Sequence, residues 1–140
     1  MDPNCLFCKI IAGEIPSYKV YEDDDWFAFL DISPINLGHT LLVPKKHFRN
    51  LFDLPNNLLI KLGPVVQKLA MAIKDGVKAD GLNLGMNNEP AAGQLVFHAH
   101  VHLMPRFTND GFVNWHGHGG ETKEDFETAQ SAIKTSLVSV

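Results

Sequence analysis

A run of three histidines that alternate with apolar residues, His-Ala-His-Val-His, begins at His98. Successive side chains of a β-strand point to opposite faces, so a strand in this segment would place His98, His100 and His102 together on one face. The residues between them would face a core. Each imidazole has two polar nitrogens that need partners, so packing alone explains three such rings in a row poorly. The run therefore predicts a strand with a chemically active face.

Two kinds of chemistry use a face of histidines. A single metal ion held by all three rings is geometrically difficult, because a rise of ~3.3 Å per residue puts His98 and His102 roughly 13 Å apart at their backbones. Zinc holds imidazole nitrogens at only ~2.0–2.1 Å, although an adjacent pair of rings could share an ion. Nucleophilic catalysis needs one ring, since a neutral imidazole with a pKa of about 6.5 has a free lone pair near pH 7. The run therefore favours a nucleophilic histidine whose other nitrogen is fixed by a hydrogen bond.

The composition is that of a globular chain with low net charge. The chain has 140 residues, 45% of them hydrophobic, which suits one domain with one core. The net charge is -4 and the densest basic cluster is Lys45-Lys46, whereas a protein that grips a nucleic-acid polymer usually shows a basic stripe. No apolar run reaches the ~18 residues of a membrane span, and the first residues do not resemble a secretory signal. We expect a cytoplasmic protein with neither a nucleic-acid polymer nor a membrane as partner.

Apolar runs bounded by turn residues predict five strands. They lie at residues 18–22, 26–31, 40–43, 82–86 and 96–104, and Pro105 is expected to end the last one. Apolar residues at helical spacing predict a long helix over residues 58–73, which Gly63-Pro64 should kink or split. A short helix near residues 5–11 and a last helix after the capping box at 122–125 complete the set. Strands joined by short turns around one long helix predict the α+β class with a mainly antiparallel sheet, in a single domain over residues 1–140.

The histidine run and several blocks upstream of it resemble one known family. Residues 98–104, His-Ala-His-Val-His-Leu-Met, are similar to the signature of the histidine triad (HIT) family. The other blocks that carry the resemblance are Phe7-Cys8-Lys9-Ile10-Ile11, Glu14-Ile15-Pro16, Phe29–Pro34, Gly38–His47, Asn87, Gly93-Gln94 and Pro105-Arg106. The resemblance covers about residues 5–107 and leaves 108–140 as a variable segment. It is strongest to the nucleotide-binding, phosphoramidase-like branch and its bacterial relatives.

The resemblance implies a fold, an assembly and a reaction. Each protomer of the family carries a five-stranded antiparallel sheet with helices, and a homodimer joins two such sheets into a ten-stranded one. Members hydrolyse or transfer nucleoside monophosphates, often from purine nucleoside phosphoramidates, so the implied substrate is a purine nucleotide such as an AMP conjugate. Carried onto this sequence, His100 attacks the α-phosphorus, a covalent nucleotidyl-histidine forms, and water then cleaves it. Covalent catalysis of this kind divides one difficult displacement into two easier ones.

The resemblance also implies which residues contact the phosphate. His102 would donate to a phosphate oxygen, and Asn87 and the backbone amide of Gly93 would lie beside it. Donors of this kind stabilise charge as it shifts in the transition state. Gln94 and Leu95 belong to the same predicted binding segment. Relatives often have Ser or Thr where Leu95 stands, so one hydroxyl donor is missing from this chain.

The ribose and the base have their own predicted contacts. The resemblance implies that Asp31 accepts both ribose hydroxyls. It implies that the walls of the base pocket are Leu6, Phe7, Ile10, Phe29 and Ile32. From the residue alone, Asp31 is better explained as a turn residue before Ile32-Ser33-Pro34, and each apolar side chain taken alone is more often plain core.

Two cysteines near the start need a separate explanation. Cys5 and Cys8 have the C-x-x-C spacing, which in a reducing compartment suggests a metal site or a redox pair. A redox pair usually follows a strand, and none is predicted before Cys5. The resemblance implies a structural zinc ion held by Cys5, Cys8, His47 and His98, since such ions take four thiolate or imidazole ligands. His98 would then position its neighbour and carry no mobile proton.

Three functional hypotheses remain open at the level of sequence. The main one is a phosphoramidase-like nucleotidyl hydrolase or transferase. The second is a dinucleoside polyphosphate hydrolase, as in the fragile histidine triad branch, although that branch uses Gln near the position of Asn87. The third is a nucleotide-binding zinc module without catalysis, which the unusual Leu95 keeps open. His116 and His118 match no role in the family and are expected to lie in a surface loop.

Overall fold

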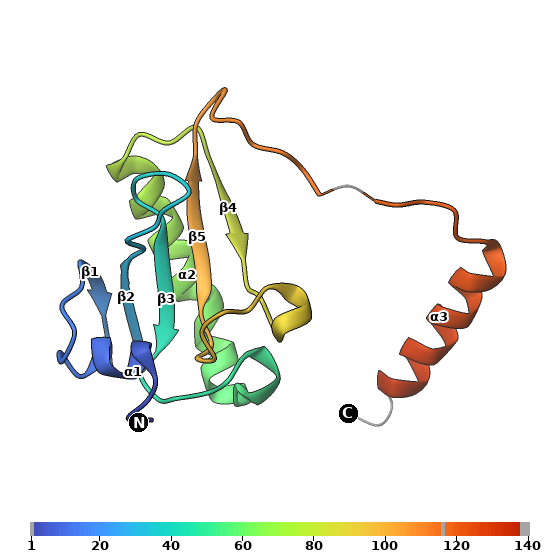
Figure 1. The fold of residues 1–140 in the computed structure, drawn as a ribbon, viewed down its shortest axis with the longest axis horizontal. Helices are drawn as coiled ribbons and strands as arrows, with labels where there is room; N and C mark the ends of the chain where they lie inside the picture. The colour runs from blue at the N-terminus through green and yellow to red at the C-terminus, as the bar shows by residue number, and fades with distance from the viewer. Residues whose placement is uncertain (1, 116, 138–140) are drawn as a thin grey trace. The chain divides into compact units, whose positions relative to one another are not determined.

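The computed structural model of this chain describes residues 2–115 and 117–137. The chain divides into two compact units, residues 1–110 and residues 111–140. The first unit holds a sheet with two helices, and the second holds one further helix, α3 (Figure 1). His116 lies outside the described residues. The prediction of a single domain over the whole chain stays a prediction.

The predicted antiparallel sheet is present in the first unit. Among the described residues it consists of β1 (Lys19–Glu22), β2 (Trp26–Leu30), β3 (Thr40–Pro44), β4 (Gly81–Gly85) and β5 (Val101–Arg106). These strands lie in the order β1-β2-β3-β5-β4, and every neighbouring pair is antiparallel. The α+β class predicted from sequence is therefore confirmed.

Helices cover both faces of this sheet. The long helix α2 (Asn56–Gly76) packs Leu58, Val65 and Leu69 against one face, where Trp26, Leu42 and Leu103 lie in the same buried cluster. The short helix α1 (Leu6–Ile11) contributes Phe7, Cys8 and Ile10 to a second cluster on the other face, with Phe27, Phe29 and Val43. This sandwich explains why the apolar run of β2 is buried along nearly its whole length, as the sequence predicts.

The last strand begins later and ends later than the sequence predicts. It runs from Val101 to Arg106, so His98 and His100 lie just before it in irregular chain, with a bend over residues 96–98. The backbone N–H of Ala99 donates to the carbonyl of Phe48, 2.7 Å away, in the loop that follows β3. The regular pairing of β5 with β3 begins only at Val101, opposite Leu42, so residues 96–100 precede the ladder.

Pro105 lies inside β5 and does not end it, contrary to the prediction. The pairing of β5 with β3 reaches only as far as Leu103, opposite Thr40. Beyond that point the side-chain amide of Asn36 donates to the carbonyl of Pro105 at 2.9 Å. In an antiparallel strand the N–H and C=O of one residue face the same side, so the missing N–H of Pro105 removes no ladder hydrogen bond.

Helix α2 continues through Gly63-Pro64, so the predicted split does not occur. Pro64 is exposed and lacks the N–H that would bond one turn back, whereas Val65 and Leu69 are buried against the sheet. Burial of this apolar stripe offsets the lost hydrogen bond and holds the two halves in one helix. Within the described ranges 2–115 and 117–137, no helix has the length and apolar character needed to cross a bilayer.

The second unit contains α3 (Lys123–Leu137), and its predicted capping box is present. The hydroxyl of Thr122 accepts from the backbone N–H of Asp125 at 3.2 Å, and the carboxylate of Asp125 accepts from the N–H of Thr122 at 2.8 Å. The apolar side chains expected to share one face, among them Phe126 and Ile133, are exposed. The helix therefore forms through local signals and not through burial in a core of its own unit.

Candidate functional site

His100 lies in the middle of the histidine run and is buried, with one ring nitrogen fixed. Its side chain is 6% exposed and packs edge-on against Phe7, with ring centroids 5.2 Å apart. Nδ1 lies 2.6 Å from the backbone carbonyl of His98. A carbonyl can only accept, so Nδ1 carries the proton and Nε2 keeps a free lone pair. No hydrogen bond from the described residues occupies Nε2, which leaves His100 in the form that a nucleophile needs.

A cavity of about 360 Å³ opens beside His100. His102, Asp31, Asn87 and Gly93 line it with polar groups. Its apolar lining includes Leu6, Phe7, Ile10, Phe29, Ile32 and Leu95. Residues as far apart in sequence as Leu6 and His102 therefore meet around one space, as the resemblance implies. The size and the mixture of apolar walls with a few polar groups are typical of a small-molecule site.

A second histidine, His39, fixes the orientation of His102. The backbone N–H of Ile35 donates to Nδ1 of His39 at 3.3 Å, so that nitrogen accepts and the proton of His39 is on Nε2. Nε2 of His39 lies 2.9 Å from Nδ1 of His102, to which it donates. The proton of His102 is therefore on its own Nε2. This chain of bonds gives His102 the donor that a phosphate oxygen requires.

Asp31 directly follows β2 and lies close to the ring of His39. One carboxylate oxygen accepts from the backbone N–H of Ser33 at 2.8 Å, as in a turn, and the other lies 3.7 Å from Nδ1 of His39. Asp31 also lines the cavity. Its side chain therefore combines the turn role and a position in the site, which the sequence treats as alternatives.

The imidazoles beside the cavity are held in the neutral form. Burial lowers the pKa of His100, because a charged ring loses its hydration; the hydrogen bond to the His98 carbonyl opposes this in part. Burial, with the neighbouring rings of His100 and His39, lowers the pKa of His102 to about 4. Burial also lowers the pKa of His39, against the attraction of Asp31. All three rings therefore lack a charge at neutral pH.

On the other side of His100, two thiols and two imidazoles meet. The ligand atoms of Cys5, Cys8, His47 and His98 all lie within 4.8 Å of one another. Sγ of Cys5 is 3.4 Å from Nδ1 of His98, and Sγ of Cys8 is 3.4 Å from Nδ1 of His47. Both cysteines are buried free thiols. The structure thus brings together the four residues predicted to hold zinc.

The ring of His98 is turned toward the two sulfurs. It is fully buried, with 0% of its surface exposed, and Nε2 lies 2.8 Å from the carbonyl of Pro44. Nε2 therefore donates, and the lone pair on Nδ1 faces Cys5 and Cys8. His98 does not line the cavity that His100 and His102 border. Its position is that of a ligand or scaffold and not of a group that meets substrate.

The segment that carries Asn87, Gly93 and Leu95 is fastened to the loop after β3. Arg49 makes two contacts with the carboxylate of Glu89, at 2.9 and 2.7 Å. Arg49 thereby lowers the pKa of Glu89 to about 2. Gly93 has a φ of +84°, a left-handed conformation that glycine adopts without strain. The binding segment is therefore held in a defined shape at the edge of the cavity.

Gln94, a predicted substrate contact, faces away from the cavity. Only 3% of its surface is exposed. Its amide nitrogen donates to the carbonyls of Arg49 and Val96 at 2.7 and 3.1 Å, and its oxygen accepts from the N–H of Glu89 at 2.8 Å. Every one of these partners is backbone. Gln94 therefore shapes the segment on which Gly93 and Leu95 lie.

His39 is the site residue that the sequence reasoning gave no role. It lies inside a block quoted for the resemblance, Gly38–His47, but its neighbours in sequence are loop residues and the start of β3. A signal was available, because a histidine directly before a buried strand is unusual among core residues. Its partner His102 is sixty-three positions away, so only the pairing of β3 with β5 shows what it does.

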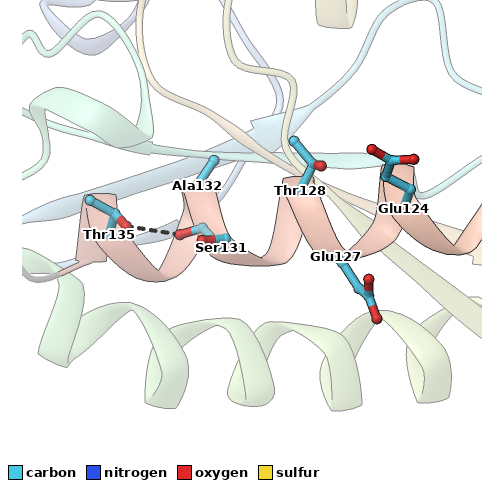
Figure 2. A pocket seen from close by; sticks show the side chains of 6 residues that line it. All are labelled: Glu124, Glu127, Thr128, Ser131, Ala132 and Thr135. Atoms are coloured by element: carbon cyan, nitrogen blue, oxygen red, sulfur yellow. Dashed lines mark hydrogen bonds between the residues drawn. The ribbon is translucent and has the colours of Figure 1, made fainter.

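A second hollow lies on α3, away from the histidine run in sequence. Figure 2 shows the side chains that border it, which are Glu124, Glu127, Thr128, Ser131, Ala132 and Thr135. All six come from this one helix, and one of them, Thr135, donates its hydroxyl to the backbone carbonyl of Ser131 at 3.0 Å. The hollow is therefore a groove between neighbouring side chains of a single helix. His118, which precedes it, is exposed in the loop.

Comparison with known proteins adds relatives along the whole chain. A protein called hit from Bacillus subtilis strain 168 is 47% identical over 139 residues, which cover 97% of this chain and 96% of that one. Adenosine 5'-monophosphoramidase HNT1 of Candida albicans is 42% identical over 74% of this chain and 70% of its own length. These relatives share much of the chain and not merely the histidine run.

Solved structures agree with the fold. The crystal structure of SMU.412c from Streptococcus mutans UA159 superposes with a TM-score of 0.91, at 45% identity, over 98% of this chain and 87% of that one. A zinc-bound histidine triad family protein from Mycobacterium smegmatis has a TM-score of 0.74 at 33% identity, over 98% of each chain. The HIT domain model matches residues 12–109, which is most of the chain. With the sheet, the histidine run and these relatives in agreement, this chain belongs to the HIT family.

Proposed function

We propose that this protein is a nucleotidyl hydrolase or transferase of the phosphoramidase type, which acts on the α-phosphorus of purine nucleotides. One observation carries the proposal: His100 presents an unprotonated, unpaired Nε2 to a cavity that also contains His102, Asp31 and Asn87. The Candida relative that is named as an adenosine 5'-monophosphoramidase supports the same class of substrate. AMP conjugates with a phosphorus–nitrogen bond are the expected substrates.

The geometry supports a reaction in two displacements. Nε2 of His100 attacks the α-phosphorus, the P–N bond breaks, and the amine departs with the electron pair of that bond and one proton from solvent. Water then attacks the phosphorus of the nucleotidyl-histidine, which releases the nucleoside monophosphate, the neutral ring of His100 and one proton. The bond from Nδ1 to the His98 carbonyl keeps the ring aimed throughout both steps.

The groups around His100 have separate tasks in this proposal. His102 donates from Nε2 to a phosphate oxygen, and its own Nδ1 is held by His39. Asn87 and the amide of Gly93 provide further donors at the polar end of the cavity, where charge increases on the phosphoryl oxygens. Asp31 accepts the ribose hydroxyls. Apolar side chains that line the cavity, among them Phe7 and Ile10, hold the base.

A structural zinc ion fits the buried cluster of thiols and imidazoles. The donor set of Cys5, Cys8, His47 and His98 has the number and kind of ligands that such ions take, and the lone pair of His98 already faces the sulfurs. When bound, the ion would cross-link α1 to the chain after β3 and to the start of the histidine run. His98 then has no mobile proton, and its carbonyl positions His100. The zinc-bound Mycobacterium structure supports this assignment.

A homodimer and a cytoplasmic location complete the proposal. Strand β4 lies at the end of the strand order and pairs with β5 alone among the described strands, while Leu84 on it is exposed. An unpaired edge of this kind readily accepts another strand, so we propose that β4 pairs with its counterpart in a second copy. The free thiols of Cys5 and Cys8 suit a reducing compartment such as the cytoplasm.

The decisive experiment replaces His100. His100→Ala is expected to abolish hydrolysis of adenosine 5'-phosphoramidate, while the protein stays folded and still binds AMP, because the cavity walls remain. Wild-type protein quenched during turnover should carry one nucleotidyl group on His100, detected by mass spectrometry of its peptides. His118→Ala, at an exposed histidine of the second unit, serves as the control and should keep full activity. Full activity of His100→Ala would end the proposal.

A further inference from the structure

Leu95 is a large apolar side chain that is exposed at the edge of the cavity. It lines the cavity, yet 88% of its surface is accessible. Its neighbour in the chain, Gln94, is buried with its amide bonded to backbone on both sides. Leu95 is therefore held at the rim by a fixed loop. Apolar surface in such a place gains free energy when a ligand covers it, in proportion to the area removed from water.

The direction of attack shows what would cover Leu95. In an in-line displacement the leaving group departs from the face of phosphorus opposite the nucleophile. His100 is buried at the floor of the cavity, so the leaving group points outward, to the rim. Leu95 lies on the segment that also carries Asn87 and Gly93, the polar groups beside the phosphate. The part of the substrate that reaches Leu95 is therefore the leaving group and not the base.

We propose that Leu95 makes this protein select nucleotide conjugates whose leaving group has apolar surface, namely alkyl or aryl amines. This inference rests on the proposed function. Leu95 offers no hydroxyl, so it adds nothing for a small polar leaving group such as ammonia. It offers a surface of several carbon atoms to an alkyl chain or ring. Such a contact raises the rate only for substrates that possess the apolar group.

The rim has a second exposed apolar residue, which provides a matched control. Ile32 is 85% exposed and also lines the cavity, but it follows Asp31, at the ribose end. A polar substitution of Ile32 should weaken all adenosine conjugates alike, because the nucleoside is common to them. A polar substitution of Leu95 should weaken only those with an apolar leaving group. The two positions thus separate recognition of the nucleoside from recognition of the amine.

The test measures kcat/KM for adenosine 5'-phosphoramidate and for its N-benzyl derivative. This parameter reports the steps up to amine release, and hydrolysis of the nucleotidyl-histidine is common to both substrates. Comparing the ratio of the two values between variants cancels the intrinsic reactivity of each amine. Leu95→Asn should lower the benzyl-to-unsubstituted ratio about tenfold, the size of effect that a small apolar contact gives. Leu95→Met, which stays apolar, should keep the wild-type ratio, and so should Ile32→Asn.

The outcomes separate the two proposals. If wild-type protein hydrolyses both substrates and Leu95→Asn keeps its ratio, the inference about Leu95 is wrong and the proposed function stands. If Ile32→Asn changes the ratio as much as Leu95→Asn does, recognition of the apolar leaving group is not a specific property of Leu95, and the inference also fails. If wild-type protein hydrolyses neither substrate and no nucleotidyl-histidine is trapped, the proposed function itself fails and the inference with it.

Discussion

The two histidines that flank His100 lie in opposite environments. His98 is fully buried and turns Nδ1 to two sulfurs, whereas His102 borders the open cavity and receives a hydrogen bond from His39. Both belong to one alternating run and occupy one face. We call the first environment the sulfur side and the second the cavity side of His100. The difference shows that the run sets the spacing of the rings, while the partner of each ring sets what it can do.

This contrast predicts that the two sides respond to mutation in different ways. A change on the cavity side should alter turnover and leave stability nearly unchanged, because its groups face a space that substrate fills. A change on the sulfur side should alter stability first, because its groups are buried and depend on one another.

Among changes to the two sides of His100, the largest effect is expected for His102→Ala. This variant removes a donor aimed at the phosphate, and loss of one such donor typically lowers kcat by about 10²–10³-fold. The melting temperature should stay close to that of wild type, since His102 is only partly buried. Steady-state kinetics with adenosine 5'-phosphoramidate and a thermal melt measure both quantities. A variant that unfolds far below the wild-type temperature would break the division between the two sides.

The second effect is a loss of stability in Cys8→Ser. The substitution removes one thiol from the buried cluster, and we expect roughly 3 kcal/mol less unfolding free energy, as for other losses of a metal ligand. Elemental analysis should find about one zinc ion per wild-type chain and much less in the variant. Chelator should lower the melting temperature of wild-type protein but not that of the variant. Wild-type protein that contains no zinc and melts alike with and without chelator would contradict the assignment.

Much of the fold was predictable, because it depends on local patterns. The apolar run of β2 reads as a strand covered on both faces, and the spacing of Leu58, Val65 and Leu69 reads as a helix that covers a sheet. The errors concern boundaries set by tertiary contacts. The regular part of β5 starts only at Val101, because the N–H of Ala99 bonds to the loop carbonyl of Phe48 and not to β3. Pro105 is tolerated because β3 has no residue left to pair with it.

The site was predictable where the type of a residue indicates its role. It was not predictable where the role depends on a hydrogen-bond partner from another part of the chain. His100, Asp31 and Asn87 follow from the family resemblance, and the structure places all three at one cavity. The role of His39 depends on a hydrogen bond across two strands, which no sequence spacing shows. Gln94 does not line the cavity, because its side chain bonds to backbone groups of the loop after β3 and of its own segment.

A smaller effect on the cavity side is expected for His39→Ala. The variant leaves His102 without the bond that fixes its tautomer, and one hydrogen bond is worth about 0.5–1.5 kcal/mol, or roughly 2- to 13-fold in rate. The loss should appear in kcat more than in KM, because His39 does not line the cavity and holds His102 in position. His39→Gln, whose amide can still donate to His102, should recover part of the rate lost in His39→Ala. Equal loss in both variants with a lowered melting temperature would assign His39 to structure alone.

The mildest test changes only the pH. Burial lowers the pKa of His100 below the ordinary 6.5 and that of His102 to about 4, so both rings are mostly neutral at pH 6.5. Because the reaction needs a neutral His100, kcat/KM should hold its plateau through pH 6.5 and fall only at lower pH. Measuring kcat/KM from about pH 4 to about pH 8 gives the midpoint of this acid-side fall. A midpoint at 6.5 or above would refute the prediction.

The same depressed pKa values set the direction of the change in stability. Between pH 6.5 and about pH 4 the unfolded chain binds a proton at His102, whereas the folded chain does so only as the pH approaches 4. The free energy of unfolding therefore falls as pH decreases through that window and is unaffected by these rings above it. Melts of wild type and His102→Ala at the two ends of the window should differ less for the variant, because one buried imidazole is gone. If the melting temperature fell equally in wild type and His102→Ala, the protons would be taken up by groups other than His102, and this prediction would be wrong.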